Sequence, residues 1–303
     1  MLESEHSTHS MVAGELESDF RPGLGMICTA LRHRGAELLR RIDDFEASAE
    51  RGSAAGIPLL HPWANRLATY GYRAADRQVR LDPASPLLNF DAQHLPIHGV
   101  PWSRLAWEVK LATKDGLVAS LEWDRDELLE VFPFPHRLEM AATLLPEGLT
   151  LETTLVAGQD AAVPVSFGFH PYFGLPGLAR SQWRLVLPAM RRLALDRQLI
   201  PTGKEEPYAG MNAELGELEF DDGFATLAAT ESFSLEGAGR SITVELLEGY
   251  AYAQVFAPKD RDYIALEPMT APTNALISGS GLQLVPPGRR FRAAFRIRVD
   301  ALA

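Results

Sequence analysis

Cysteine is almost absent from this chain of 303 residues, since Cys28 is the only one. A single cysteine excludes an intramolecular disulfide and fits a reducing compartment. Long hydrophobic runs are missing too, because none approaches the ~18–20 consecutive apolar residues that a membrane-spanning helix needs. The first six residues are polar and acidic, unlike the basic start and apolar core of a signal peptide. We therefore expect a cytoplasmic protein without a membrane partner.

Positive charge is also in deficit. The chain has 29 Lys and Arg residues against 40 Asp and Glu residues, which gives a formal net charge of −11. Nucleic acids and anionic membranes select clustered Lys and Arg, so we expect neither as a main partner. Hydrophobic residues make up 46% of the chain, which is enough for a sizeable core in an ordinary globular protein.

Helical periodicity is scarce as well. No long run combines apolar residues at 3.6-residue spacing with a cap at each end. The 24 glycines and 21 prolines also interrupt the chain too often for a mainly helical fold. Alternation with a period of two is common instead, over residues 291–300 and 242–246, and residues 118–123 add another short strand. Residues 138–153 read as two strands joined by a glycine-containing turn.

These strands predict an all-β fold, a large antiparallel β-sandwich. No low-complexity linker or internal repeat divides the sequence. We therefore expect a single domain over residues 11–303, preceded by a disordered tail over residues 1–10.

Three titratable residues stand inside apolar stretches, each next to Gly or Pro. His98 precedes Gly99, His170 lies between Phe169 and Pro171, and Glu267 ends the run Tyr263–Leu266. A histidine in such a place is, taken singly, more often a core residue with satisfied nitrogens. An unpaired buried carboxylate costs several kcal/mol, however, so Glu267 must be either compensated or functional. Apolar surroundings shift pKa values in the way that proton transfer requires.

Further polar residues have two readings each. Arg66, directly after Asn65, could hold adjacent hydroxyls or a carboxylate with two parallel hydrogen bonds, or pair with a surface acid. Asp221 and Asp222 precede a glycine and read equally well as a turn. Gln254 interrupts an apolar strand, so its amide either joins neighbouring backbone or faces a ligand.

Four short motifs together resemble the aldose 1-epimerase (galactose mutarotase) family in their order and rough spacing. The resemblance covers roughly residues 24–300 and implies a galactose mutarotase-like supersandwich, in agreement with the strand pattern. His61 departs from the pattern, which more often has an apolar or aromatic residue before this proline. The motifs are Pro62-Trp63-Ala64-Asn65-Arg66, Ile97-His98-Gly99, Gly168-Phe169-His170-Pro171-Tyr172-Phe173 and Leu266-Glu267-Pro268-Met269-Thr270.

The resemblance implies interconversion of the α and β anomers of a free aldose, such as galactose or glucose. Glu267 matches the catalytic base and His170 the acid. Asp221 matches a hydroxyl-binding aspartate, with Asp222 the alternative if the register slips by one. The aromatic side chains of the motifs, Trp63, Tyr172 and Phe173, could pack on a sugar or belong to the core. The sugar-contacting positions that the resemblance implies are Asn65, Arg66, His98, Asp221 and Gln254.

Such a reaction needs no cofactor or metal, and its partner is a small sugar bound by a monomer or homodimer. Three alternatives stay open. The protein could be a sugar-binding or regulatory module without turnover, although both the acid and base positions are filled. It could be a hexose-phosphate 1-epimerase, although the four motifs hold no extra Lys or Arg for a phosphate. Finally, His98, His170 and Glu267 could form a metal site, although they lack a short local ligand spacing.

Overall fold

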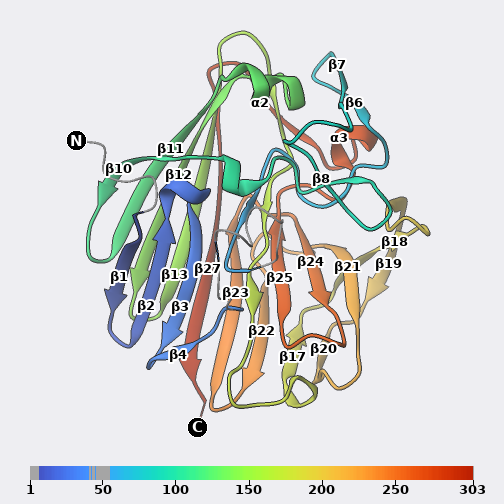
Figure 1. Ribbon diagram of the computed structural model, residues 1–303. Helices are drawn as coiled ribbons and strands as arrows, with labels where there is room; N and C mark the ends of the chain where they lie inside the picture. Colours follow the sequence, from blue (N-terminus) through green and yellow to red (C-terminus); the bar gives the residue numbers. More distant parts are fainter. Residues whose placement is uncertain (1–6, 41, 43–44, 46–54, 303) are drawn as a thin grey trace.

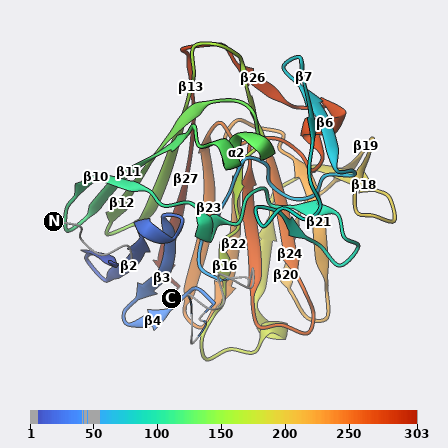
Figure 2. The ribbon, with the colours of Figure 1, turned by 45° about the horizontal axis from the view of Figure 1, so that its top comes forward.

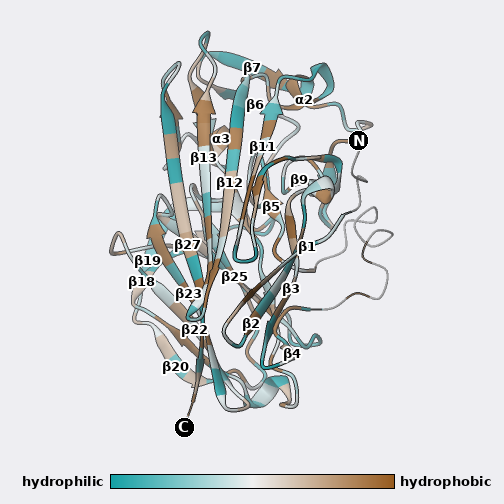
Figure 3. Ribbon diagram, turned by 90° about the vertical axis from the view of Figure 1, so that its left-hand side faces the viewer, coloured by the Kyte–Doolittle hydropathy of each residue, from teal (hydrophilic) through white to brown (hydrophobic). Residues whose placement is uncertain are grey.

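Two large antiparallel sheets dominate the computed structural model, which describes residues 7–40, 42, 45 and 55–302 (Figure 1). The first sheet has nine strands, and its long members alternate between hydrophobic and hydrophilic residues (Figure 3). In sheet order the nine strands are β10 (Glu108–Ala112), β11 (Gly116–Trp123), β12 (His136–Leu145), β13 (Gly148–Ala157), β27 (Arg290–Ala301), β23 (Arg240–Glu248), β22 (Ser232–Gly237), β17 (Arg184–Leu187) and β20 (Met211–Glu214).

The second sheet has eight strands, and Asp221, Gln254 and Glu267 stand on three of them. Strand β16 (Tyr172–Phe173) pairs with β25 outside the main path. In sheet order the other strands are β19 (Pro201–Tyr208), β18 (Met190–Leu195), β21 (Phe220–Ala225), β24 (Tyr252–Ala257), β25 (Ile264–Met269), β15 (Gly168–Phe169) and β5 (Leu59–Leu60).

The core lies between these two sheets. Phe169 of the second sheet packs against Phe295 of the first, with ring centroids 5.1 Å apart. Along β27, the side chains of Ala293, Phe295 and Ile297 are fully buried, while Arg292 is exposed on the other face. Because successive side chains of a strand point to opposite faces, one face of the strand packs into the core while the other faces outward. The predicted antiparallel β-sandwich and the strands expected over 118–123, 138–153, 242–246 and 291–300 are confirmed.

A smaller sheet extends the fold at the start of the chain. Its strands β1 and β2 contact β12, so they cover one end of the nine-stranded sheet. The predicted tail over residues 1–10 is too long, because His9 and Ser10 already pair with β2 in β1. Residues 1–6 lie outside the described part of the chain. The four strands are β1 (His9–Ala13), β2 (Leu16–Arg21), β3 (Ile27–His33) and β4 (Ala36–Glu37).

Short helices and two-stranded ribbons complete the fold. Helix α3 contacts β6, and both lie at one end of the molecule (Figures 1 and 2). No helix in the described residues is long and apolar enough to cross a membrane. The remaining elements are α2 (Asp126–Val131), α3 (Ala275–Ser278), three short 3₁₀ helices (Pro22–Leu24, Trp102–Arg104, Arg180–Gln182) and the ribbons β6 (Gly71–Ala74) with β7 (Arg77–Arg80), β8 (Asn89–Phe90) with β9 (Pro96–Ile97), and β14 (Val163–Val165) with β26 (Gln283–Val285).

Candidate active site

A pocket of about 240 Å³ opens on the face of the eight-stranded sheet that does not contact the core. The motif residues converge here although they come from distant segments of the chain. The pocket is lined by Asn65, Arg66, Ile97, His98, His170, Tyr172, Asp221, Phe256, Tyr263 and Glu267.

Glu267 and His170 form a buried pair in this pocket, with Oε1 of the carboxyl 3.2 Å from Nε2 of the imidazole. Strand alternation explains why both face the pocket. On β25, Leu266 points into the core, so Glu267 points to the opposite face. At the end of β15, Phe169 packs into the core and His170 follows on the pocket side. The second carboxyl oxygen of Glu267 has no partner among the described residues, so it is free to meet a ligand.

Burial shifts the pKa values of this pair in opposite directions. Desolvation, helped by the negative charge of Asp221, raises the pKa of Glu267 well above its ordinary value. Desolvation, together with repulsion from His98, lowers the pKa of His170 well below its ordinary value. Both shifts favour the uncharged forms, a protonated carboxyl and a neutral imidazole. In these forms the pair carries no net charge.

Tyr172 fixes the orientation of His170. The two rings stack with their centroids 4.1 Å apart and 14° between their planes. The Tyr172 hydroxyl also lies 3.2 Å from Nε2 of His170, the same nitrogen that faces Glu267. A ring held by both stacking and a hydrogen bond keeps its proton-transfer nitrogen in place.

The Asn65–Arg66 and His98–Gly99 segments lie against each other. The amide of His98 donates to the carbonyl of Asn65 at 2.9 Å, and Arg66 forms an isolated bridge with Ile97. Asn65 and His98 both have left-handed backbones, with φ of 57° and 62°. Gly99 also has positive φ, and a Cβ there would lie 2.3 Å from the carbonyl oxygen of His61. Glycine at this position is what allows the two segments to approach.

The hydrogen bonds of His98 define its tautomer. Its Nδ1 accepts from the backbone amide of Asn65 at 3.2 Å, which assigns the proton of the neutral ring to Nε2. Burial, with a smaller contribution from the Arg66 charge, lowers the pKa of His98 to about 3. His98 is therefore neutral near neutral pH and offers the pocket an N–H donor. Its ring lies 5.5 Å from that of His170, centroid to centroid.

Arg66 is held between two carboxylates. Its Nε donates to Asp91 at 2.8 Å and its Nη2 to Asp221 at 3.3 Å, while Nη1 donates to the side-chain oxygen of Asn65 at 3.1 Å. Burial by itself raises the pKa of Asp91, but the Leu95 amide and Arg66 hold it below its ordinary value. The sequence did not identify Asp91, because an aspartate in a polar loop has no local signature of a site.

The structure decides between the two candidate aspartates. Asp221 lines the pocket, and its Oδ1 accepts a hydrogen bond of 2.7 Å from Nε2 of Gln254. Asp222 faces the other way and accepts from Nε of Arg192 at 2.8 Å. Gln254 is paired with Glu267 across β24 and β25, so it stands beside the acid–base pair and orients Asp221.

The aromatic residues divide between pocket and core. Tyr172 lines the pocket, whereas Trp63 and Phe173 are buried in the hydrophobic core. Phe256 and Tyr263 also line the pocket and were missed, although Phe256 is two residues after Gln254 and strand alternation places it on the same face.

A metal-binding arrangement was the third alternative from the sequence. Within the described part of the chain, no group of three or more His, Cys, Asp or Glu side chains could hold a metal ion. The His98, His170 and Glu267 set therefore finds no support as a ligand group.

Known proteins share this fold and much of the sequence pattern. The aldose 1-epimerase family model matches residues 24–298. An uncharacterized protein of Escherichia coli K12, YihR, is 25% identical over 261 residues, which are 80% of each chain. The Slr1438 protein of Synechocystis is 25% identical with a TM-score of 0.78 and covers 98% of this chain and 96% of its own.

More distant structures agree in fold. A galactose mutarotase-like protein of Clostridium acetobutylicum has a TM-score of 0.84 at 19% identity, covering 97% of this chain and 95% of its own. The galactose 1-epimerase of Lactobacillus acidophilus has a TM-score of 0.76 at 14% identity, covering 96% and 92%. With the family model matching nearly the whole length, the resemblance seen in the four motifs is confirmed, and the chain belongs to the aldose 1-epimerase family.

Proposed function

We propose that this protein is an aldose 1-epimerase that interconverts the α and β anomers of a free, uncharged aldose. The observation that carries the proposal is the buried contact of 3.2 Å between Glu267 and His170 at a pocket rich in hydrogen-bonding groups. A carboxyl and an imidazole that share one proton are the two groups that opening a hemiacetal ring requires.

The chemistry uses that single proton in both directions. Transfer of the carboxyl proton to Nε2 of His170 gives a carboxylate and an imidazolium. The carboxylate removes the proton of the anomeric hydroxyl, and the imidazolium protonates the ring oxygen as the C1–O5 bond breaks. Rotation about the C1–C2 bond turns the aldehyde, and the same steps in reverse close the ring on its other face. Each proton transfer contributes roughly 10²–10⁴-fold.

Orientation of the sugar falls to the polar residues around the pair. The Nε2–H of His98 and the guanidinium of Arg66 supply hydrogen-bond donors for sugar hydroxyls. The carboxylate of Asp221 supplies the acceptor. Holding the sugar against the acid–base pair converts a bimolecular encounter into a positioned reaction.

The charge of the pocket favours an uncharged sugar over a sugar phosphate. Among the described residues that line it, Arg66 is the only Lys or Arg, and it is already paired with Asp91 and Asp221. A phosphate bound to Arg66 would have to displace one of these carboxylates.

Polarimetry on freshly dissolved α-glucose and α-galactose tests the proposal directly. We expect the optical rotation to reach its equilibrium value faster with the protein than in buffer, in proportion to protein concentration. Sugar binding by calorimetry without any such acceleration would contradict the proposal and support a binding module instead.

A further inference from the structure

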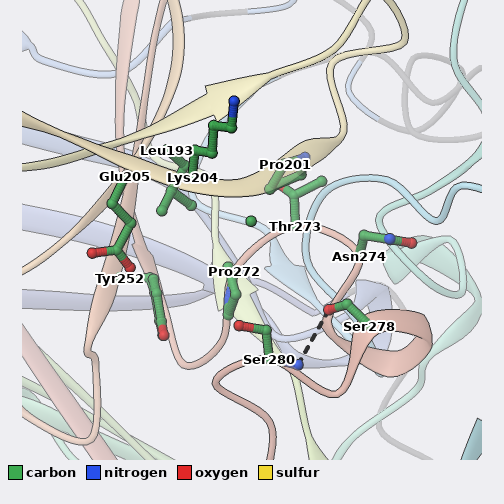
Figure 4. A pocket seen from close by; sticks show the side chains of 11 residues that line it. Leu193, Pro201, Lys204, Glu205, Tyr252, Pro272, Thr273, Asn274, Ser278 and Ser280 are labelled. Atoms are coloured by element: carbon green, nitrogen blue, oxygen red, sulfur yellow. Dashed lines mark hydrogen bonds between the residues drawn. The ribbon is translucent and has the colours of Figure 1, made fainter.

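A second, smaller cavity lies on the same face of the eight-stranded sheet (Figure 4). Strands β18, β19 and β24 form part of its wall, through Leu193, Glu205 and Tyr252. The loop from β25 to α3 forms another part, through Thr273 and Asn274. The reaction proposed above uses none of these side chains.

Two buried polar side chains in this wall have unused hydrogen-bonding groups. Thr273 and Asn274 are 5% and 8% exposed. The side-chain oxygen of Asn274 accepts from the amide of Ala68 at 2.9 Å, which leaves both N–H groups of its amide nitrogen as donors. No hydrogen bond joins the Thr273 hydroxyl to another described residue, although it borders the cavity. Both groups are therefore available to hydrogen-bond a ligand that enters the cavity.

The cavity lies next to the catalytic pocket. Tyr252 and Gln254 are two residues apart on β24, so their side chains share a face at a spacing of roughly 7 Å. A Cβ at Gly223 would lie 3.1 Å from the Gln254 side-chain oxygen and 3.3 Å from Leu193. Gly223 therefore lies between Gln254, beside the catalytic pocket, and Leu193, in the wall of the second cavity. On the opposite side, the amide of Asn274 donates to the carbonyl of Arg66 at 3.0 Å.

The lining has the chemistry of a carbohydrate site. Tyr252, Pro201 and Pro272 offer apolar surface for the face of a sugar ring, while Thr273 and Asn274 offer groups for its hydroxyls. The charged residues of β19 do not favour an anion, because Glu205 offsets the charge of its neighbour Lys204. The ammonium of Lys204 also points away from Tyr252 and Pro272 (Figure 4).

We propose that this cavity is a second sugar subsite, which holds the next residue of an oligosaccharide whose reducing-end residue lies at Glu267 and His170. The inference rests on the proposed function, because it deepens the choice of substrate at that site. With this second subsite, the substrates that fill both cavities are short oligosaccharides with a free reducing end rather than monosaccharides.

The test compares rates of mutarotation on glucose with those on four glucose disaccharides of different linkage: kojibiose, nigerose, maltose and isomaltose. At least one disaccharide should exceed glucose in kcat/KM by about tenfold, since a filled subsite adds binding energy of that order. Thr273→Val, which removes only the hydroxyl, should lower the disaccharide-to-glucose ratio about fivefold. Tyr252→Leu should lower the same ratio about tenfold.

Thr143→Val is the matched control, because Thr143 is exposed on β12 of the other sheet. It should leave the ratio unchanged. The proposal is overturned if no disaccharide is preferred over glucose, or if the two threonine variants change the ratio equally. It is also overturned if glucose 6-phosphate is the preferred substrate and Lys204→Ala removes that preference.

Calorimetric titration of the Glu267→Gln variant separates this inference from the proposed function. With turnover removed, the preferred disaccharide should still bind about tenfold more tightly than glucose, and adding Thr273→Val should reduce that advantage. If wild-type protein turns over no sugar but this difference persists, the proposed function fails and the subsite stands. If wild-type protein turns over glucose but the difference is absent, the subsite fails alone.

Discussion

At the scale of single residues, the proposed reaction depends on a proton shared by Glu267 and His170. The carboxyl is 2% exposed and the imidazole 5%, so neither group can be solvated when charged. Charged forms must therefore arise within the pair, during the reaction, with the sugar's own oxygens as partners.

Replacing the carboxyl tests its role as the base. We expect Glu267→Gln to abolish mutarotation, because an amide cannot accept the anomeric proton. Sugar affinity should stay within about tenfold, since the base is needed mainly in the transition state. Polarimetry measures the first effect and calorimetry the second. Turnover at the wild-type rate in this variant would exclude Glu267 as the base.

The pH profile should be bell-shaped, because only the pair with one proton is active. Falling pH adds a second proton, and the lowered pKa of His170 makes the imidazole the group that takes it. Rising pH removes the one proton, and the raised pKa of Glu267 makes the carboxyl the group that loses it. The roles that the family resemblance implies, a base at Glu267 and an acid at His170, would with ordinary pKa values give the opposite assignment, in which Glu267 protonates at low pH and His170 deprotonates at high pH.

The profile of kcat/KM against pH checks this assignment, with apparent pKa values that belong to the pair. The acid limb should lie well below the ordinary pKa of histidine, and the basic limb well above that of glutamate. A flat profile, an acid limb above the ordinary pKa of histidine or a basic limb below that of glutamate would contradict it.

Asp91 is predicted to position Arg66. Asp91→Asn keeps the shape of the side chain but removes the charge that holds the guanidinium, so we expect KM to rise about tenfold with a smaller change in kcat. Asp82→Asn is a suitable control, since Asp82 caps an exposed turn through a similar contact with the amide of Ala84. Equal KM values for the two variants would remove Asp91 from the site.

At the scale of elements, strand alternation and close backbone contact bring the motifs together. The strands of the eight-stranded sheet present one face to the core and the other to the pocket. The two irregular segments around Arg66 and His98 pack together at Gly99, where the carbonyl of His61 leaves no room for a Cβ.

Gly99→Ala tests this contact. The substitution adds both left-handed strain and a clash with backbone, so we expect the free energy of unfolding to fall by about 3 kcal/mol or more. Gly35→Ala is the matched control, with φ of +75° but no atom within 4 Å of the added Cβ. It should cost only about 1 kcal/mol. Similar losses for both, measured by chemical denaturation, would show that the contact with His61 is unimportant.

At the scale of the whole molecule, the two sheets enclose one continuous core that includes Cys28 on β3. Its side chain has no exposed surface, and burial raises the pKa of its thiol well above the ordinary value. A thiol that is both inaccessible and protonated does not react with disulfide reagents.

We therefore expect labelling of Cys28 by a disulfide reagent to proceed only through unfolding. Its rate should rise steeply across the denaturation transition and stay near zero in native buffer. A control with the Cys28→Ala variant gives the background signal. Rapid labelling of the native protein would mean that β3 opens locally without unfolding of the core.

Much of the fold could be predicted from residues near one another in the chain. Alternation in 291–300 and the turn at 146–148 depend only on local geometry, and β27 and the β12–β13 hairpin formed where expected. The boundary of the predicted tail was wrong, because pairing of His9 and Ser10 with β2 depends on a neighbouring strand rather than on the composition of the segment.

The sequence by itself determined the β architecture and, through four motifs, the family and the candidate acid and base. The tertiary structure alone decided that Asp221 rather than Asp222 faces the pocket, that Asp91 holds Arg66, and that Trp63 and Phe173 belong to the core. It also decided the burial that raises the pKa of Glu267 and lowers that of His170. The reason is physical: alternation and turn preference act between neighbours in the chain, whereas burial and electrostatic interaction depend on which distant segments the fold brings together.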